Sequence, residues 1–140
     1  MKAEKKYKRG FIAGMFDIFH TGHLNMIKIA KAHCDYLIVA IGTDDLYRIR
    51  KKREPIMPFC ERRDIIAAIR YVDEVVSVSD VDKISAYNKY KFNAIFVGED
   101  YESDDIYIKA SEELKKLDVD VIYVKRLNIS STILRKYFEK

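Results

Sequence analysis

The sequence predicts an α/β fold: a single Rossmann-like domain over residues 1–140, built on a doubly wound parallel sheet of about five strands with helices on both faces. Two observations predict it. Short apolar runs alternate with longer amphipathic stretches, and this alternation is typical of a parallel sheet. Residues 36–41 are apolar without interruption, as expected of a strand that helices cover on both faces. Folds of this class bind ligands beyond the carboxyl ends of their strands.

Each element has a pattern of its own. The first strand ends on the apolar residues 11–13, and Leu24 and Ile27 lie on one face of a helix expected over residues 24–33. The strand over 36–41 follows. The remaining elements are expected, in chain order, as a helix over 61–71, a strand over 74–78, a helix over 81–90 capped by Asp80, a strand over 94–97, a helix over 105–117, a strand over 119–124 and a short helix from about residue 131.

The composition fits a soluble globular protein. Hydrophobic residues make up 49% and charged residues 34%, which excludes wholesale disorder. Cys34 and Cys60 form no disulfide framework, and no signal peptide or membrane-length apolar segment is present, so we expect a cytoplasmic protein with no membrane partner. The net charge of +4 suits phosphorylated small molecules as well as nucleic acid. The ten tyrosines are scattered and form no stacking stripe, so we expect no nucleic-acid partner.

A motif with two histidines follows the first strand directly. Residues 14–23 read Gly-Met-Phe-Asp-Ile-Phe-His-Thr-Gly-His, which places His20 and His23 near the start of a helix. Backbone N–H groups and the helix dipole attract phosphate at such a position. Gly22 lets the backbone approach a ligand closely, and Gly14 leaves room for a nucleotide. A zinc site is the weaker interpretation, since His-x-x-His supplies only two ligands.

The chemistry that this motif suits is transfer at a phosphate group. Two imidazoles beside an α-phosphate can stabilise the charge that builds up as five-coordinate phosphorus forms. A phosphomonoester has its second pKa near 6, so at neutral pH it is mostly a dianion and a competent nucleophile. Such a reaction requires no general base.

The sequence resembles the cytidylyltransferase family of the HxGH nucleotidyltransferase superfamily, and most of all the bacterial glycerol-3-phosphate cytidylyltransferases. Five segments carry the resemblance: residues 14–23, 34–45, 61–75, 98–101 and 126–132. They cover nearly the whole chain from Phe11 onward. The sequence departs from the family pattern at Met15, where a small residue is usual, at Tyr101, which replaces Trp, and at Asn128, which replaces Gly in a shortened last signature.

The resemblance implies roles for individual residues. It implies catalytic roles for His20, His23, Arg62 and Arg126, and contacts to the acceptor from Asp17, Asp44 and Arg126. The residues that it implies for nucleotide binding are Gly14, Met15, Phe16, Gly22, Lys51, Lys52, Ile129, Ser130, Ser131 and Thr132.

Several of these residues also have a plainer interpretation. Arg62 could form a surface ion pair with Glu61 or Asp64, and residues 130–132 could simply cap a helix. Asp17 either fixes the turn and orients a histidine or binds the acceptor. The basic run at residues 48–53 is either a solvated turn or a triphosphate-binding loop.

The leading expectation is a reaction of CTP with a small phosphorylated alcohol, glycerol 3-phosphate above all, which gives CDP-glycerol and pyrophosphate. Mg²⁺ would accompany the nucleotide, without metal ligands from the protein. The alternatives are an adenylyltransferase that forms FAD or an ADP-sugar, a choline- or ethanolamine-phosphate cytidylyltransferase, and a non-catalytic nucleotide-binding module. The resemblance further implies a homodimer that contacts through residues 70–73.

Overall fold

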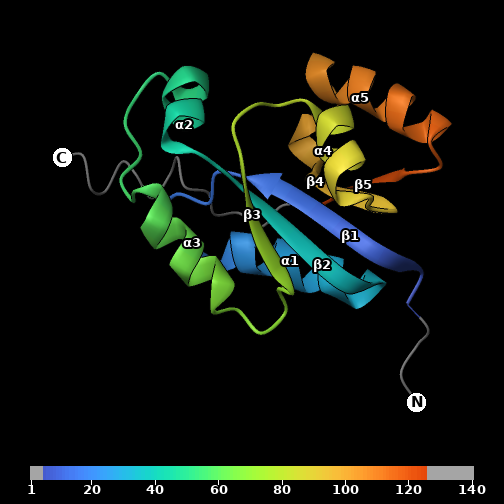
Figure 1. The fold of residues 1–140 in the computed structure, drawn as a ribbon, viewed down its shortest axis with the longest axis horizontal. Coiled ribbons are helices and arrows are strands. Elements are labelled where there is room, and N and C mark those ends of the chain that lie inside the picture. Colours follow the sequence, from blue (N-terminus) through green and yellow to red (C-terminus); the bar gives the residue numbers. More distant parts are fainter. Residues whose placement is uncertain (1–4, 126–140) are drawn as a thin grey trace.

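Five parallel strands form the central sheet of this computed structural model, which describes residues 5–125 (Figure 1). The strands are β1 (Tyr7–Gly14), β2 (Cys34–Gly42), β3 (Glu74–Val78), β4 (Ala94–Gly98) and β5 (Asp120–Val124). Their order across the sheet is β3-β2-β1-β4-β5, and every neighbouring pair is parallel. The predicted α/β fold is therefore confirmed, and the winding reverses between β1 and β4.

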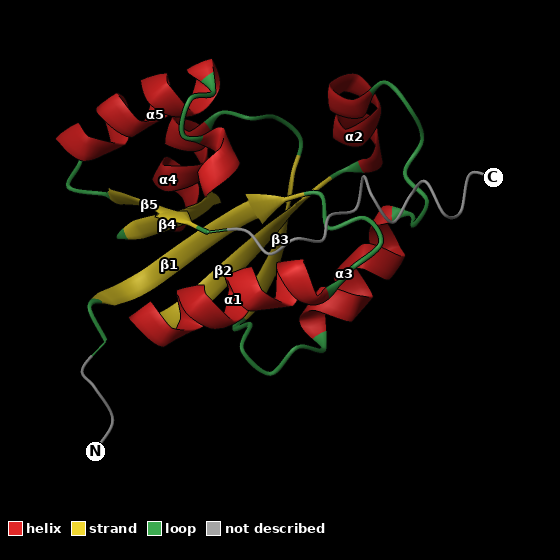
Figure 2. Ribbon diagram, turned by 180° about the vertical axis from the view of Figure 1, so that it is seen from behind, coloured by secondary structure: helices red, strands yellow, loops and turns green. Residues whose placement is uncertain are grey.

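Helices cover both faces of this sheet (Figure 2). The helices are α1 (Thr21–His33), α2 (Asp44–Lys51), α3 (Phe59–Ala67), α4 (Lys83–Tyr90), α5 (Asp105–Lys116) and a short 3-10 turn, η1 (Glu99–Tyr101). Helices α1 and α3 pack on one face, and α4 and α5 pack on the other, as the two opposed views show. Among residues 5–125, no helix combines the length and the apolar character needed to cross a membrane.

The two faces of the sheet build two separate apolar clusters. Successive side chains of a strand point to opposite faces, so Phe11 packs with α4 and α5 while Ile12 packs with α1 and α3. In β2, Ile38 and Val39 divide in the same way, and both are fully buried. Strands buried on both faces need the uninterrupted apolar run from which the fold was predicted.

Helix α2 is an element that the sequence pattern did not reveal. Only Leu46 and Tyr47 of this helix are buried, and cations dominate its second half, so its apolar face is too narrow to stand out. Thr43 begins the helix by accepting a hydrogen bond from the backbone N–H of Leu46 at 3.2 Å. The basic run at residues 48–53 is therefore mostly helical.

Other helix ends differ from the predicted ones by a few residues. Helix α1 begins at Thr21, because His20 caps it, and α3 begins at Phe59, directly after Pro58. Helix α4 is capped by Asp82 and not by Asp80, since Asp82 Oδ1 accepts the backbone N–H groups of Ile84 and Ser85 at 3.0 and 3.1 Å. The helix expected from about residue 131 lies outside the described residues.

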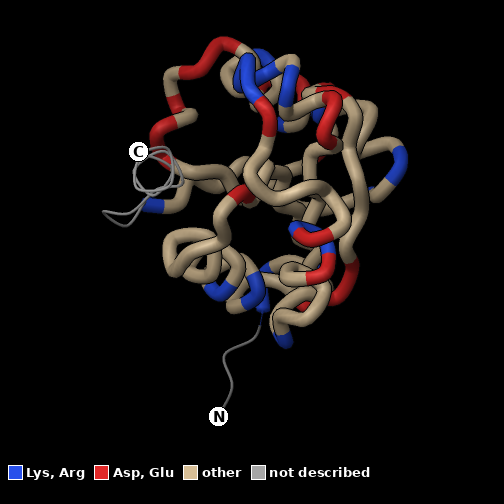
Figure 3. The backbone as a smooth tube through the Cα atoms, turned by 90° about the vertical axis from the view of Figure 1, so that its left-hand side faces the viewer, with Lys and Arg blue, Asp and Glu red and all other residues tan. Residues whose placement is uncertain are grey.

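Charged side chains of both signs are spread along the backbone. Figure 3 shows Lys and Arg segments on several parts of the molecule, with Asp and Glu segments between them. The local placement of a few cations around the pocket therefore matters more for ligand binding than the net charge of the chain.

Candidate active site

A cavity of about 550 Å³ lies at the carboxyl ends of the strands, where the sheet reverses its winding between β1 and β4. Gly14, Gly42 and Gly98, which end three of the strands, are among the residues that line it. This is the position at which open parallel sheets bind ligands, and the volume is in the usual range for small-molecule sites. The sequence prediction of a site beyond the strand ends is therefore met by a cavity of suitable size.

The first motif forms one wall of this cavity. His20 Nδ1 accepts the backbone N–H of Gly22 at 2.9 Å, and His23 Nδ1 accepts the backbone N–H of His20 at 3.3 Å. The two histidines thus form a reciprocal capping box at the start of α1. Because each Nδ1 accepts a hydrogen bond, the neutral form of each ring carries its proton on Nε2. Both rings are therefore set to donate through Nε2.

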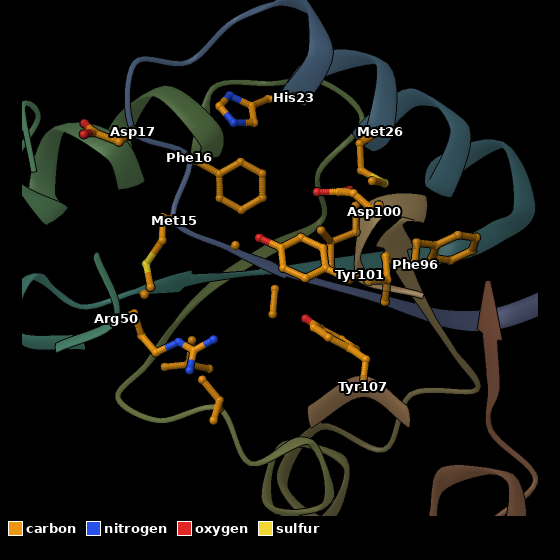
Figure 4. A pocket seen from close by; sticks show the side chains of 18 of the residues that line it. Met15, Phe16, Asp17, His23, Met26, Arg50, Phe96, Asp100, Tyr101 and Tyr107 are labelled. Atoms are coloured by element: carbon orange, nitrogen blue, oxygen red, sulfur yellow. The ribbon is translucent and has the colours of Figure 1, made fainter. Parts of the chain in front are cut away.

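Packing fixes the orientation of the two imidazoles. Their ring centroids lie 3.9 Å apart with the planes only 22° from parallel. The rings of Phe16 and Phe19 each lie 5.3 Å from the ring of His23, and Figure 4 shows Phe16 beside His23 at the pocket. Two stacked, sterically held donors at a helix N-terminus suit one phosphate group.

The turn between β1 and α1 holds an unusual backbone. Phe16 and Ile18 both have positive φ angles, 56° and 51°, which non-glycine residues rarely adopt. A Cβ atom on Gly14 would come within 2.9 Å of the Phe16 ring, so the glycine is needed for Phe16 to fold back over the strand end. Gly14, Met15, Phe16 and Gly22 all line the pocket, where the sequence placed the nucleotide.

Arg62 lies in a different place from the one predicted. The side chain is buried, and its guanidinium donates to the backbone oxygens of Met15 and Gly42 at 2.8 Å and of Met57 at 2.9 Å. It also forms an ion pair with Asp44 at 2.5 Å, whereas the plainer interpretation of the sequence paired it with Glu61 or Asp64. Arg62 is not among the residues that line the cavity. Its guanidinium therefore holds three segments together beside the pocket, which leaves it poorly placed for a direct phosphate contact.

Asp17 and Asp44 also hold the backbone. Asp17 is buried, and its carboxylate accepts the Tyr47 hydroxyl and the backbone N–H groups of Ile56 and Met57, all within 3.0 Å. Asp44 accepts the backbone N–H of Phe59 at 3.0 Å besides its ion pair with Arg62. Asp17 lines the pocket, and Asp44 does not. Of the two interpretations offered for Asp17, these contacts favour the one in which it fixes the turn.

The basic residues of α2 and of the turn after it differ in what their side chains contact. Arg48 forms ion pairs with Asp45 and Glu54, both at 2.7 Å. Of the two lysines expected to bind the nucleotide, Lys51 lines the cavity and Lys52 does not: Lys52 ends α2 in a left-handed conformation. Arg50 and Arg53, which the sequence did not single out, line the cavity beside Lys51.

The opposite wall was largely missed from the sequence. It includes Tyr101, Tyr107 and Lys83, and Figure 4 shows Tyr107 and Arg50 on the side of the pocket away from His23. The rings of Tyr101 and Tyr107 lie 5.4 Å apart. Burial raises the pKa of the Tyr107 hydroxyl, so this ring stays neutral. A usable signal existed, because Lys83 and Tyr107 both follow shortly after the carboxyl end of a strand.

Five of the predicted site positions cannot be compared with this geometry. Arg126, Ile129, Ser130, Ser131 and Thr132 lie outside the described residues. Within residues 5–125, no group of three or more His, Cys, Asp or Glu side chains is arranged to hold a metal ion.

Comparison with known proteins agrees with this site. The chain is 44% identical over 75 residues to a protein named FAD synthase from Thermococcus kodakarensis, an alignment that covers 54% of this chain and spans only half of that protein. It is 38% identical over 116 residues to the FAD synthase of Pyrococcus abyssi, with 81% of this chain and 78% of the relative covered. A crystal structure of the lipopolysaccharide core biosynthesis protein from Thermoplasma volcanium matches with a TM-score of 0.72 and 25% identity, over 89% of this chain and 99% of that one.

A family model described as cytidylyltransferase-like matches residues 11–137, which includes the whole of the histidine motif and every strand end around the cavity. The five resembling segments, the switch-point cavity and the paired histidines all fall within that match. The chain therefore belongs to the cytidylyltransferase-like family of nucleotidyltransferases.

Proposed function

We propose that this nucleotidyltransferase is an adenylyltransferase that transfers AMP from ATP to FMN and so forms FAD and pyrophosphate. The observation that carries the proposal is the similarity to FAD synthases, which in the Pyrococcus abyssi protein extends over 81% of this chain. The sequence analysis held FAD formation as an alternative and placed CTP and glycerol 3-phosphate first. The relatives support the alternative better than that leading expectation.

The lining of the cavity also favours an acceptor with a flat apolar part. Tyr101, Tyr107 and Phe96 contribute aromatic rings to it, and Met15 and Met26 contribute adaptable thioethers. An isoalloxazine ring can pack against such surfaces, whereas glycerol 3-phosphate has no apolar group to place there. The lining is thus compatible with FMN as the acceptor.

The reaction requires alignment and charge stabilisation. In the proposed step, an oxygen of the FMN phosphate attacks the α-phosphorus of ATP, a new P–O–P link forms, and the bond to the β-phosphate breaks. Pyrophosphate leaves with the electron pair of that bond. His20 and His23 donate from Nε2 to the α-phosphate oxygens, where negative charge accumulates in the transition state.

Other residues serve the triphosphate or the shape of the site. We propose that Arg50, Lys51 and Arg53 attract the β- and γ-phosphates from the α2 side of the cavity. Mg²⁺ enters with ATP, because triphosphate oxygens are ligands that this ion prefers. Arg62 and Asp17 act on the reaction by positioning the segments that carry these cations and the histidine motif.

A two-by-two substrate test decides between the proposal and the leading sequence expectation. ATP and CTP are each offered with FMN and with glycerol 3-phosphate, and products are separated by chromatography while pyrophosphate release is followed. We expect FAD from ATP and FMN, with ATP favoured over CTP by about a hundredfold or more in kcat/KM, since a site that pairs with one base leaves polar groups unpaired with the other.

The remaining outcomes are equally informative. CDP-glycerol from CTP and glycerol 3-phosphate would overturn the proposal and restore the first expectation. Product from neither acceptor, together with tight nucleotide binding, would favour either a different acceptor, such as a sugar phosphate, choline phosphate or ethanolamine phosphate, or the non-catalytic module. The His20 and His23 assignments hold for either nucleotide, because both nucleotides present the same α-phosphate.

A further inference from the structure

Lys83 is a buried cation to which the mechanism above assigns no role. It is the first residue of α4, directly after the Asp82 cap, and its side chain is only 8% exposed. It lines the cavity, and its Nζ lies 5.4 Å from the centroid of the Tyr107 ring. The connection from β3 to α4 therefore places an ammonium group in the part of the cavity wall that also contains Tyr107 and Arg50.

Two carboxylates, Asp80 and Asp82, act on this ammonium group, but neither forms an ion pair with it. Lys83 takes part in none of the ion pairs of residues 5–125. Asp82 and Asp80, the nearby carboxylates, accept backbone N–H groups of their own loop and helix. Burial lowers the pKa of Lys83 to about 8, and the charge of Arg50 acts in the same direction against the weaker pull of the two aspartates.

A buried cation beside a second cation is unfavourable unless a ligand supplies negative charge. Nucleotidyl transfer brings two anions together, the nucleotide and the acceptor phosphate, and these repel one another. In the proposed function, the triphosphate binds at the start of α1 and beside the cations of α2. The acceptor phosphate needs a cation of its own, and the wall that carries Lys83 also carries the tyrosines suited to a flavin ring.

We propose that Lys83 binds the phosphate group of the acceptor, on the wall of the cavity formed by α4 and α5. The naming of FMN as that acceptor rests on the proposed function, whereas the role of Lys83 in binding an acceptor phosphate does not. The Lys83 ammonium group makes a charge-assisted hydrogen bond to the phosphate and offsets its repulsion from the nucleotide.

The test compares FMN with riboflavin, which is the same ligand without its phosphate. Quenching of flavin fluorescence gives both dissociation constants, and their ratio measures what the phosphate contributes to binding. In Lys83→Met we expect the preference for FMN to fall by about tenfold or more, the usual scale for one charge-assisted hydrogen bond. Lys83→Arg, which keeps the charge, should retain most of the preference.

Two controls isolate the effect. Lys89→Met removes an exposed ammonium group from the same helix and should leave the ratio unchanged. Mg·ATP affinity of Lys83→Met, measured by calorimetry, should stay within about twofold of wild type, because the proposal gives Lys83 no nucleotide contact. Circular dichroism establishes that each variant is folded.

Three outcomes overturn the proposal or separate it from the assignment of FMN. A loss of Mg·ATP affinity with an unchanged FMN preference would place Lys83 on the nucleotide phosphates. If neither the FMN preference nor the Mg·ATP affinity changes in Lys83→Met, the role of Lys83 is structural only. If the wild-type protein binds neither flavin, the proposed function fails, and a second measurement, which can use a different acceptor, then decides the role of Lys83.

That measurement is protection from acetylation. Acetic anhydride reacts with neutral amines, which attack its carbonyl carbon and release acetate and a proton, and mass spectrometry locates the modified lysines. At pH 8 the lowered pKa makes Lys83 more reactive than a lysine of ordinary pKa with equal access. Protection by FMN, or by glycerol 3-phosphate if the acceptor is a different one, supports the proposal. Protection by Mg·ATP alone, or by none of the three, refutes it.

Discussion

His20 and His23 each serve the helix with one ring nitrogen and the reaction with the other. Each Nδ1 accepts a backbone N–H at the start of α1, so Nε2 is the atom through which each ring can donate to a phosphate. From the sequence, the histidines were expected to act in catalysis beside a helix start that attracts phosphate. The structure joins the two, because the capping bonds set the tautomer that the chemistry uses.

This double role can be separated by substitution. His20→Asn keeps a side-chain acceptor for the Gly22 N–H, so we expect its stability to stay within about 0.5 kcal/mol of wild type while kcat falls by about a hundredfold. His20→Ala should lose about 1 kcal/mol of stability in addition. Thermal unfolding and steady-state kinetics check both. Normal turnover in a folded His20→Asn protein would reduce this residue to a helix cap.

Lys83 should make the stability of the protein depend on pH. Its folded-state pKa, about 8, lies below the ordinary value of 10.5, so the fold disfavours the charged form. The resulting cost is fully present below pH 8 and disappears as the pH rises from 8 to 10.5. Lys83→Met removes it, so we expect the variant to gain stability relative to wild type at pH 7, by at most about 3 kcal/mol, and to lose this advantage near pH 10.5.

Urea unfolding at pH 7 and at pH 10 measures this difference directly. The exposed Lys89→Met serves as the control and should differ from wild type by the same small amount at both values. A stability difference for Lys83→Met that does not change with pH would mean that the lysine is hydrated in the folded protein.

At the scale of elements, Arg62 connects segments that no single helix or strand could hold together. Its four hydrogen bonds reach the turn after β1, the end of β2, the start of α2 and the residue before Pro58. All these acceptors are fixed by the fold, which makes Arg62 a positioning residue for the cavity. The family resemblance implied a phosphate contact for Arg62, whereas its contacts in the structure are with the protein itself.

Arg62→Lys tests this task against the implied phosphate contact. A lysine cannot reach four separate acceptors, so we expect a loss of about 2 kcal/mol or more in stability, with turnover falling as the segments lose their alignment. Arg63→Lys is the matched control, because Arg63 is half exposed and forms an ion pair with Asp64, and it should stay within about 0.5 kcal/mol of wild type. Unchanged stability in Arg62→Lys with a clear loss of ATP affinity would favour a direct contact.

At the scale of the whole molecule, we propose that the protein is a homodimer that associates through residues 70–73. Arg70 is exposed and donates to the Tyr71 hydroxyl at 2.8 Å, which lowers the pKa of that hydroxyl. Asp73 is held within the chain by Lys31 and by the backbone N–H of Leu37. Arginine and tyrosine are the residues most often enriched at the centre of interfaces.

Arg70→Glu should therefore weaken association. Reversing this charge at the centre of a two-fold contact places like or unmatched charges against the partner, and we expect the dimer dissociation constant to rise at least about tenfold. Analytical ultracentrifugation measures the change, with the exposed Lys89→Met as a control on the far face of the sheet. A wild-type protein that sediments as a monomer at all concentrations would remove the homodimer from consideration.

The sequence by itself determined the features that depend on neighbouring residues. The alternation of apolar runs and amphipathic stretches is a local pattern, and it located every strand of the sheet to within a few residues. The histidine motif is equally local, since a strand end, a helix start and two imidazoles all occur within ten residues. The sequence pattern did not reveal helix α2, because its buried face consists of only two residues.

Only the tertiary structure decided which side chains face the cavity and which lie behind it. Arg62 and Arg63 are adjacent in the sequence, yet one is buried among backbone oxygens and the other is half exposed. Lys83 and Tyr107 reach the cavity because the strand order β3-β2-β1-β4-β5 brings the loops after β3 and β4 beside the turn after β1. Burial and charge environment arise from packing between segments far apart in the chain, and a local sequence pattern does not predict that packing.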